Sequence, residues 1–367
     1  QINLSPFDVT QGGFTGGAIN AVTRSGSNTF TGSAYFFQRS ETLAGKTPLG
    51  LQNVTGASAE RLPDFSNNRY GIRLGGPIIE DKLFFFVNAE ILRSETPRPI
   101  TGNYVGDVGI GGVEDLRQFL ISEVGYDPGG FGDKNSVLDS DKVLAKIDWN
   151  ISRQHKLTAR YSLNDSENTD AFDSDFNSIN FSGRNEVFPN TTHTAALELT
   201  STFGQNMSNK LIFGYTDVKD DRGVNGEPFP TVNIDDGRGG IFLGNEPFST
   251  ANILEQQIFT ITNDFNIFAG NHTITFGTHN EFYDIANLFI PFNYGWYFYD
   301  SVEDFRQAVR AANDPTIDTP LVFAQRGFSI VGDNPLDPNN VGDASNNIGA
   351  FNAYQLGFYV QDEWQAT

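Results

Sequence analysis

The connections between the predicted strands of this chain alternate strictly between short and long. Ten segments carry the alternation of apolar and polar residues that indicates a β-strand with one apolar face. They lie at about 28–38, 69–78, 83–93, 143–149, 157–163, 195–203, 211–216, 259–267, 272–282 and 354–360. Every second connection has only a few residues, as at 79–82 and 269–271. All short turns therefore lie at one end of the predicted strands and all long loops at the other.

Two folds have strands with one apolar face, a soluble β-sandwich and a membrane barrel. A soluble domain with five long loops lacking secondary structure contradicts the usual loop lengths. Short periplasmic turns and long extracellular loops are typical of bacterial outer-membrane barrels. The sequence therefore predicts an all-β fold, a transmembrane antiparallel β-barrel in the outer membrane of a Gram-negative bacterium. Its long extracellular loops are expected at about 39–67, 95–138, 165–191, 218–254 and 284–350.

Composition agrees with a barrel. The chain has 33 Phe and 12 Tyr but no stretch of 18 apolar residues, so it contains no candidate transmembrane helix. It has no cysteine, which excludes disulfides and thiolate metal sites. The net charge of −21 disfavours a nucleic-acid partner.

The acidic charge is concentrated in the loops, where the four later long loops carry about −18 of the net −21. The simpler interpretation is solvation of exposed loops above the lipid bilayer, with divalent cations bridging to lipopolysaccharide. Repulsion of anionic ligands is the alternative.

Two loops are expected to contain short helices. Residues 113–118 resemble residues 302–307 in sequence. Val302, Phe305, Val309 and Ala312 lie on one helical face, and Ser301 with Asp304 resembles a capping box. Both segments are interpreted as packing elements that make the extracellular end rigid.

No residue set predicts catalysis or a cofactor, so we expect no enzyme. The four histidines, His155, His193, His272 and His279, form no motif with each other. A loop calcium site is the less favoured alternative for two acidic segments, because both lack the spacing of an EF-hand. One segment is 333–347, and the other contains Asp165, Glu167, Asp170, Asp173 and Asp175.

Residues 289–299 are rich in aromatic side chains. Exposed aromatic residues are good anchors for a peptide, a glycan or a partner lipoprotein. The favoured alternative is that the ninth strand continues above the membrane as a hairpin with aromatic cross-strand pairs. The loop candidates for ligand binding are Tyr294, Trp296, Tyr297 and Tyr299.

Three sequence blocks carry a resemblance to a known family. Residues 12–37 read GGFTGGAINAVTRSGSNTFTGSAYFF, residues 68–90 read NRYGIRLGGPIIEDKLFFFVNAE, and residues 357–364 read GFYVQDEW. The first block resembles the junction between plug and barrel in TonB-dependent receptors, especially the Oar-like members common in Bacteroidetes-type bacteria. The matching positions are Gly16, Gly17, Ile19, Asn20, Thr23, Arg24, Ser25, Gly26, Asn28, Phe30 and Gly32.

The resemblance implies a domain division and a function. Residues 1–27 would be the C-terminal end of the plug domain, and 28–367 the first ten strands of a barrel of about 22. We therefore expect a partial chain, cut within the plug and after the tenth strand.

The implied function is active transport of an unidentified ligand, driven by TonB and its inner-membrane energising complex. The alternative is an Oar-like barrel with a structural, adhesion or protein-export role beside a partner protein, such as a surface lipoprotein.

Overall fold

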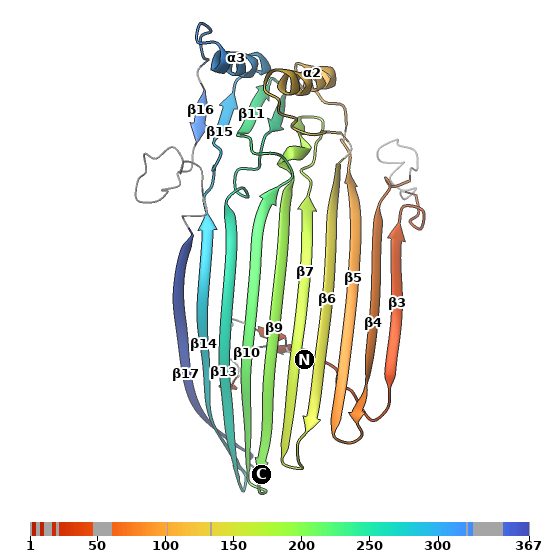
Figure 1. The fold of residues 1–367 in the computed structure, drawn as a ribbon, viewed down its shortest axis with the longest axis vertical. Coiled ribbons are helices and arrows are strands. Elements are labelled where there is room, and N and C mark those ends of the chain that lie inside the picture. The colour runs from red at the N-terminus through yellow and green to blue at the C-terminus, as the bar shows by residue number, and fades with distance from the viewer. Residues whose placement is uncertain are drawn as a thin grey trace.

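Ten long strands form one antiparallel sheet that curves as the wall of a barrel (Figure 1). The computed structural model describes residues 2–4, 8–10, 17–19, 22–46, 61–100, 102–132, 134–320, 322–325 and 348–366. Within these residues β3 and β17 are the two edges of the sheet and do not pair, so the wall is open. In order across the wall, the strands are β3 (Thr31–Ser40), β4 (Ser66–Ile79), β5 (Leu83–Arg98), β6 (Lys134–Asn150), β7 (His155–Asp170), β9 (Glu186–Phe203), β10 (Met207–Val224), β13 (Asn252–Ala269), β14 (His272–Phe289) and β17 (Gly349–Trp364).

All ten predicted strands are present, and most of them extend further at the end next to the long loops. The segment predicted at 143–149, for example, is part of β6, which has 17 residues. Crossing the membrane takes about 9–11 residues of a tilted strand. The long strands therefore continue above the bilayer on the side of the long loops.

Each strand has one apolar and one polar face. A row of aligned residues crosses the wall through Val87, Ala145, Tyr161, Ala195, Tyr215, Phe259, Phe282 and Tyr354. The neighbouring row on the other face contains Lys146, Arg160, Thr260, Glu281 and Gln355. The first row faces lipid and the second faces the lumen, because a charge on the lipid face costs several kcal/mol.

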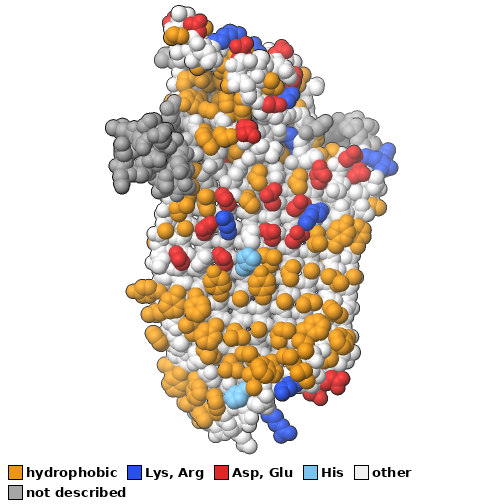
Figure 2. Space-filling view, viewed as in Figure 1, with side chains coloured by type: hydrophobic (Ala, Val, Ile, Leu, Met, Phe, Trp, Pro, Cys, Tyr) orange, Lys and Arg blue, Asp and Glu red, His pale blue; other side chains and the backbone are white. Residues whose placement is uncertain are grey.

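The outer face of the wall has an apolar lower part and a charged upper part (Figure 2). Figure 2 shows hydrophobic side chains gathered in a band over the lower part of the wall, with charged side chains above them. In the charged zone Arg93 pairs with Asp141 at 2.8 Å and with Asp139 at 3.8 Å. Among the described residues, no helix is both long and apolar enough to cross a membrane.

Above the wall, four of the long loops build a second structure that the sequence did not predict. We call it the cap. Its sheet has five short strands in the order β16, β15, β11, β12, β8. The pairs β11–β15 and β12–β8 are parallel, and each joins strands from two different loops. The cap consists of α2 (Gly109–Glu123), β8 (Ser178–Asn180), η1 (Ser182–Arg184), β11 (Thr231–Asp236), β12 (Gly239–Leu243), β15 (Trp296–Tyr299), α3 (Val302–Asn313) and β16 (Phe323–Gln325).

The cap has its own apolar core. The two expected helices are both present as α2 and α3, and they lie at the top of the molecule in Figure 1. Ser301 caps α3, since its hydroxyl oxygen accepts a hydrogen bond from the Asp304 amide at 3.1 Å. Ala312, expected on the apolar face, is exposed. The buried residues of the core are Val113, Leu116, Leu120, Tyr126, Ile179, Phe181, Val232, Ile234, Ile241, Leu243, Val302 and Phe305.

Polar contacts between loops complete the cap. No side chain of α2 caps its own N-terminus. Asp236, at the end of β11, instead accepts hydrogen bonds from the Val108 amide at 3.2 Å and from the Tyr104 hydroxyl at 2.9 Å. A carboxylate near the first turn of a helix is stabilising because it faces unpaired backbone amides. Burial, and then the hydrogen bond to Asp236, raise the pKa of Tyr104.

The first residues lie apart from the wall. β1 (Ile2–Leu4) and β2 (Gly17–Ile19) pair as a separate two-stranded sheet. Figure 1 draws them behind the wall, on the side opposite the apolar band of Figure 2. They therefore lie on the lumen side.

A pair of neighbouring substitutions tests the two faces. Phe213 faces lipid and Ile212 faces the lumen opposite Glu198. We expect Phe213→Arg to lower the free energy of unfolding by about 3 kcal/mol and Ile212→Arg to change it little. Urea unfolding of the full-length protein in lipid vesicles measures both. Equal losses would contradict the assignment of faces.

A second pair tests the cap core. Leu116 is fully buried on α2, whereas Ile121 on the same helix is 37% exposed. We expect Leu116→Ala to lower the free energy of opening the cap by about 3 kcal/mol, and Ile121→Ala to have little effect. Hydrogen exchange of the β11 and β15 amides provides the measurement. Unchanged exchange in Leu116→Ala would mean that the cap is not one cooperative unit.

Candidate functional site on the lumen and the extracellular face

The lumen side of the wall repeats one polar arrangement at two places. Tyr35 on β3 lies across Gly71 and donates a hydrogen bond to Glu90 on β5 at 2.6 Å. A Cβ at Gly71 would collide with the tyrosine ring. Gly71 therefore lets the tyrosine ring lie flat against the wall and reach a carboxylate two strands away.

The second arrangement is at the other edge of the sheet. Tyr359 on β17 lies across Gly277 and donates to Asp264 on β13 at 2.5 Å. A Cβ at Gly277 would also meet the tyrosine ring. These two pairs add hydroxyl and carboxylate groups to the polar lumen face.

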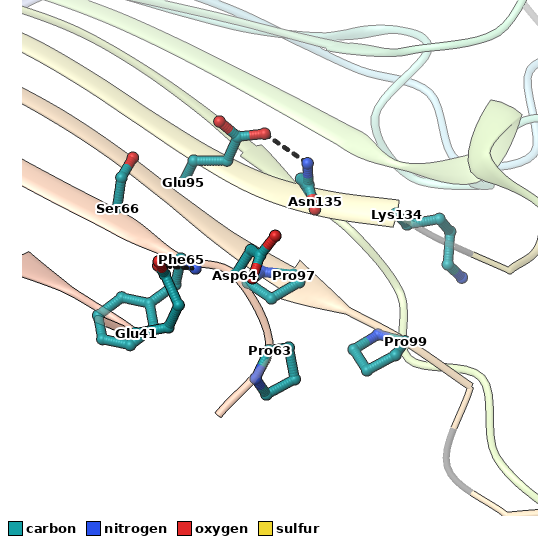
Figure 3. A pocket seen from close by; sticks show the side chains of 10 residues that line it. All are labelled: Glu41, Pro63, Asp64, Phe65, Ser66, Glu95, Pro97, Pro99, Lys134 and Asn135. Carbon is teal, nitrogen blue, oxygen red and sulfur yellow. Dashed lines mark hydrogen bonds between the residues drawn. The ribbon is translucent and has the colours of Figure 1, made fainter. Parts of the chain in front are cut away.

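A groove of about 540 Å³ lies at the extracellular ends of β4, β5 and β6 (Figure 3). Glu41, Asp64 and Glu95 bring carboxylates to it, and three prolines add apolar surface. Glu95 lies on the same side of β5 as Val87, which faces lipid. The groove therefore opens on the outer side of the wall and is not part of the lumen.

Lys134, at the rim of this groove, holds the wall to the cap. Figure 3 shows its side chain turned away from the carboxylates. Its ammonium donates to the carbonyl of Asn180 at 2.8 Å, to the Ser174 hydroxyl at 3.2 Å and to the carbonyl of Phe172. Burial lowers the pKa of Lys134 to about 8. The residue is only 4% exposed, so it ties β6 to loop 171–185 and is not available to a ligand.

The four aromatic candidates fall on two faces of the cap sheet. Tyr297 and Tyr299 align with Val232 and Ile234, which are core residues. Tyr299 packs edge-on against Phe305, with 5.1 Å between ring centroids. Trp296 faces the opposite side of the sheet, and Tyr294, in the turn before β15, is 40% exposed. Tyr299 therefore packs against the core, Tyr297 lies on the same face of the sheet, Trp296 is half-buried on the other face, and Tyr294 is exposed.

Residues 289–299 do not continue the ninth strand as a hairpin, although Phe298 faces Phe323 across the antiparallel β15–β16 pair. β14 ends at Phe289, and the chain turns through Phe292 at a φ of 60° before it enters β15 of the cap. There β15 pairs in parallel with β11, which precedes it by about 65 residues. Side-chain packing onto α3 and pairing with another loop decided this arrangement, and neither is visible in the local sequence pattern.

Sequence reasoning also missed the neighbours of Trp296. Its ring lies 4.8 Å from Phe298 and 5.4 Å from Phe292, measured between centroids. Phe248 and Phe323 extend the contacts on either side. We call these five rings the aromatic row. Figure 2 shows hydrophobic side chains on the cap over β11, β15 and β16. Phe292, Trp296 and Phe298 lie in the aromatic segment 289–299, whereas Phe248 and Phe323 are distant in the sequence and have no signal there.

The predicted carboxylate ligands are dispersed. Asp165 accepts a hydrogen bond from Thr191, Asp173 pairs with Arg98 at 3.4 Å, and Asp175 binds the Asn177 and Ser178 amides. Those amides and the Ser178 hydroxyl hold the pKa of Asp175 below its usual value. In the described part of the chain, no three His, Cys, Asp or Glu side chains are grouped to hold a metal ion. Segment 333–347 lies outside the described residues, and the calcium site stays a prediction.

Comparison with known proteins agrees with this architecture. The family model described as an outer membrane beta barrel domain matches residues 22–106 and 129–367. The unmatched interval contains α2, so the family match omits one helix of the cap.

Two relatives show how much of a larger protein the chain resembles. The TonB-dependent transporter Oar of Myxococcus xanthus is 31% identical over 160 residues, which is 41% of this chain and 14% of Oar. The crystal structure of the outer membrane transporter YddB from Escherichia coli superposes with a TM-score of 0.60 at 14% identity, covering 99% of this chain and 41% of YddB. The likeness to YddB shows the fold alone.

The resemblance to Oar-like TonB-dependent receptors, predicted from three short blocks, is confirmed by the family match and by the similarity to Oar. The chain spans less than half of the length of either relative. The chain therefore belongs to the outer membrane β-barrel domain family, and it is located in the bacterial outer membrane.

Proposed function

We propose that this chain is part of a transporter that moves a polar ligand across the bacterial outer membrane with energy delivered by TonB. The observation that carries the proposal is the polar lumen face, where Tyr35–Glu90 and Tyr359–Asp264 lie flat against the wall. The relative Oar is named a TonB-dependent transporter, which supports the same reading. Residues 1–27 would then be the end of a plug, and TonB with its inner-membrane complex the partner.

Transport is tested with the intact gene in its own host. The strains are the wild type, a deletion of this gene and a deletion of tonB, and the readout is mass spectrometry of the culture medium. We expect some small polar compounds to be consumed by the wild type and to remain in the medium of both deletion strains. Normal consumption by the gene-deletion strain would contradict transport, and normal consumption by the tonB strain would contradict TonB dependence.

The same cultures discriminate the alternative role. A barrel for adhesion, surface assembly or protein export would leave consumption of small compounds unchanged. Deletion of the gene would instead remove proteins from the medium or from the cell surface. The gene-deletion strain therefore separates uptake from the alternative in one comparison.

We also propose that the two candidates outside the core face, the exposed Tyr294 and the half-buried Trp296, belong to the surface that first contacts the ligand or a partner lipoprotein. Phe248, Phe292, Phe298 and Phe323 enlarge this surface, and Phe323 is 63% exposed. Aromatic side chains in a contiguous cluster account for much of the binding energy of many interfaces. Tyr297 and Tyr299 would act indirectly, because they support the sheet from its core side.

A matched set of variants tests this surface. We expect Trp296→Ala combined with Tyr294→Ala to reduce uptake of the identified compounds about tenfold or more, as the loss of 1.4 kcal/mol or more would. Phe176→Ala is the control, since Phe176 is 54% exposed on another extracellular loop. Uptake by the double variant equal to that of the control would exclude the aromatic row as a contact surface.

A further inference from the structure

The segment that leads into β3 contacts the wall through three residues, Ser25, Gly26 and Asn28. We call residues 22–30 the strap. It runs from the lumen side to the start of β3, next to the short turn between β4 and β5 (Figure 1). Val22 at its beginning is 88% exposed, whereas the residues that follow contact β4, β5 and β6.

The strongest fastening joins Asn28 to Asp81 in the β4–β5 turn. The Asn28 side-chain amide donates to Asp81 Oδ1 at 2.5 Å, and the Asp81 backbone amide donates to Asn28 Oδ1 at 2.8 Å. Asp81 has a φ of 61°, a left-handed conformation that Asp and Asn tolerate better than other non-glycine residues. The turn is itself tied to β6, because Asn150 donates to the Asp81 carbonyl at 3.0 Å.

Two further fastenings precede Asn28. Gly26 lies against the backbone of the wall, where a Cβ would collide with the carbonyl oxygens of Phe85 and Gly76. Ser25 accepts a hydrogen bond from the Lys146 ammonium of β6 at 2.9 Å. Lys146 is also 3.6 Å from the Asp148 carboxylate, which holds the ammonium in place. The strap is therefore attached to three strands by two side chains and one close backbone approach.

We propose that residues 25–28 of the strap are a mechanical anchor that transfers a pull on the preceding residues to β4, β5 and β6 and keeps it from β3. The inference rests on the proposed function, in which TonB pulls on the segment before the strap. β3 pairs only with β4 among the described residues, and its first pair is Thr31 with Gly75. Without the anchor, a pull would act directly on that first pair of β3 with β4.

The anchor also explains part of the sequence resemblance in physical terms. Ser25, Gly26 and Asn28 belong to the matching positions of the first block. Each makes one of the three fastenings, and glycine is required where the backbone of the strap touches the backbone of β5. The first sequence block therefore contains residues that attach the strap to the wall, in addition to the residues that connect the two domains.

Single-molecule force spectroscopy on the full-length protein in a lipid bilayer, pulled from its N-terminal end, tests the anchor. We expect a force peak at release of the strap that precedes the peak for β3. Asn28→Ala should remove the first peak. Asn88→Ala is the matched control, because Asn88 makes one hydrogen bond, to the Ile72 carbonyl at 3.3 Å, away from the strap. An unchanged first peak in Asn28→Ala would overturn the proposal.

An exchange of the two partners guards against a general folding defect. Asn28→Asp places two carboxylates together and should remove the peak, whereas Asn28→Asp with Asp81→Asn restores a donor and an acceptor and should recover it. Lack of recovery in a double variant that keeps its heat-modifiable mobility in gels would contradict the anchor. The applied pull needs no TonB, so failure of the proposed transport would leave these force peaks unaffected.

Discussion

Every backbone amide and carbonyl of this wall must find its partner within the protein, because the bilayer core offers none. The antiparallel ladder meets this requirement for the eight strands that lie between the edges β3 and β17. Once the ladder exists, the side chains are forced to alternate between lipid and lumen. The apolar row from Val87 to Tyr354 and the polar row beside it are consequences of that geometry. Charges such as Arg93 and Asp141 appear on the outer face only where the strands have left the apolar band.

The wall supplies fixed points on which the functional parts are mounted. Above it, the strand ends bring four loops close enough for α2, α3 and five short strands to share one core. Lys134 and Asp236 connect elements from different loops, so the cap is tied to the wall and to itself by buried polar bonds. Below it, the β4–β5 turn offers Asp81 to the strap. These contacts connect both ends of the wall to other parts of the chain, as the proposed pull from the periplasm would require.

The ten strands, their two faces and the end at which the long loops lie follow from the local sequence, because each depends on a period of two residues and on connection length. The two helices were also predictable, since Val302, Phe305 and Ser301 carry a helical period and a cap. The lumen arrangement was not, because Tyr35, Gly71 and Glu90 come together only when three strands are in register. Likewise, the aromatic row around Trp296 joins Phe248 of one long loop to residues of another.

The sequence by itself determined that this chain is an outer-membrane wall with short turns on one side and long loops on the other. It did so because a lipid-facing strand must alternate at every second residue. Only the tertiary structure decided that the loops fold into a cap and that Tyr299 packs against its core. Strands of three to six residues, such as β8, β11 and β15, are too short to show a period, and β11 and β15 pair across about 65 residues. Their arrangement depends on the shared core, which exists only after the wall has brought the loops together.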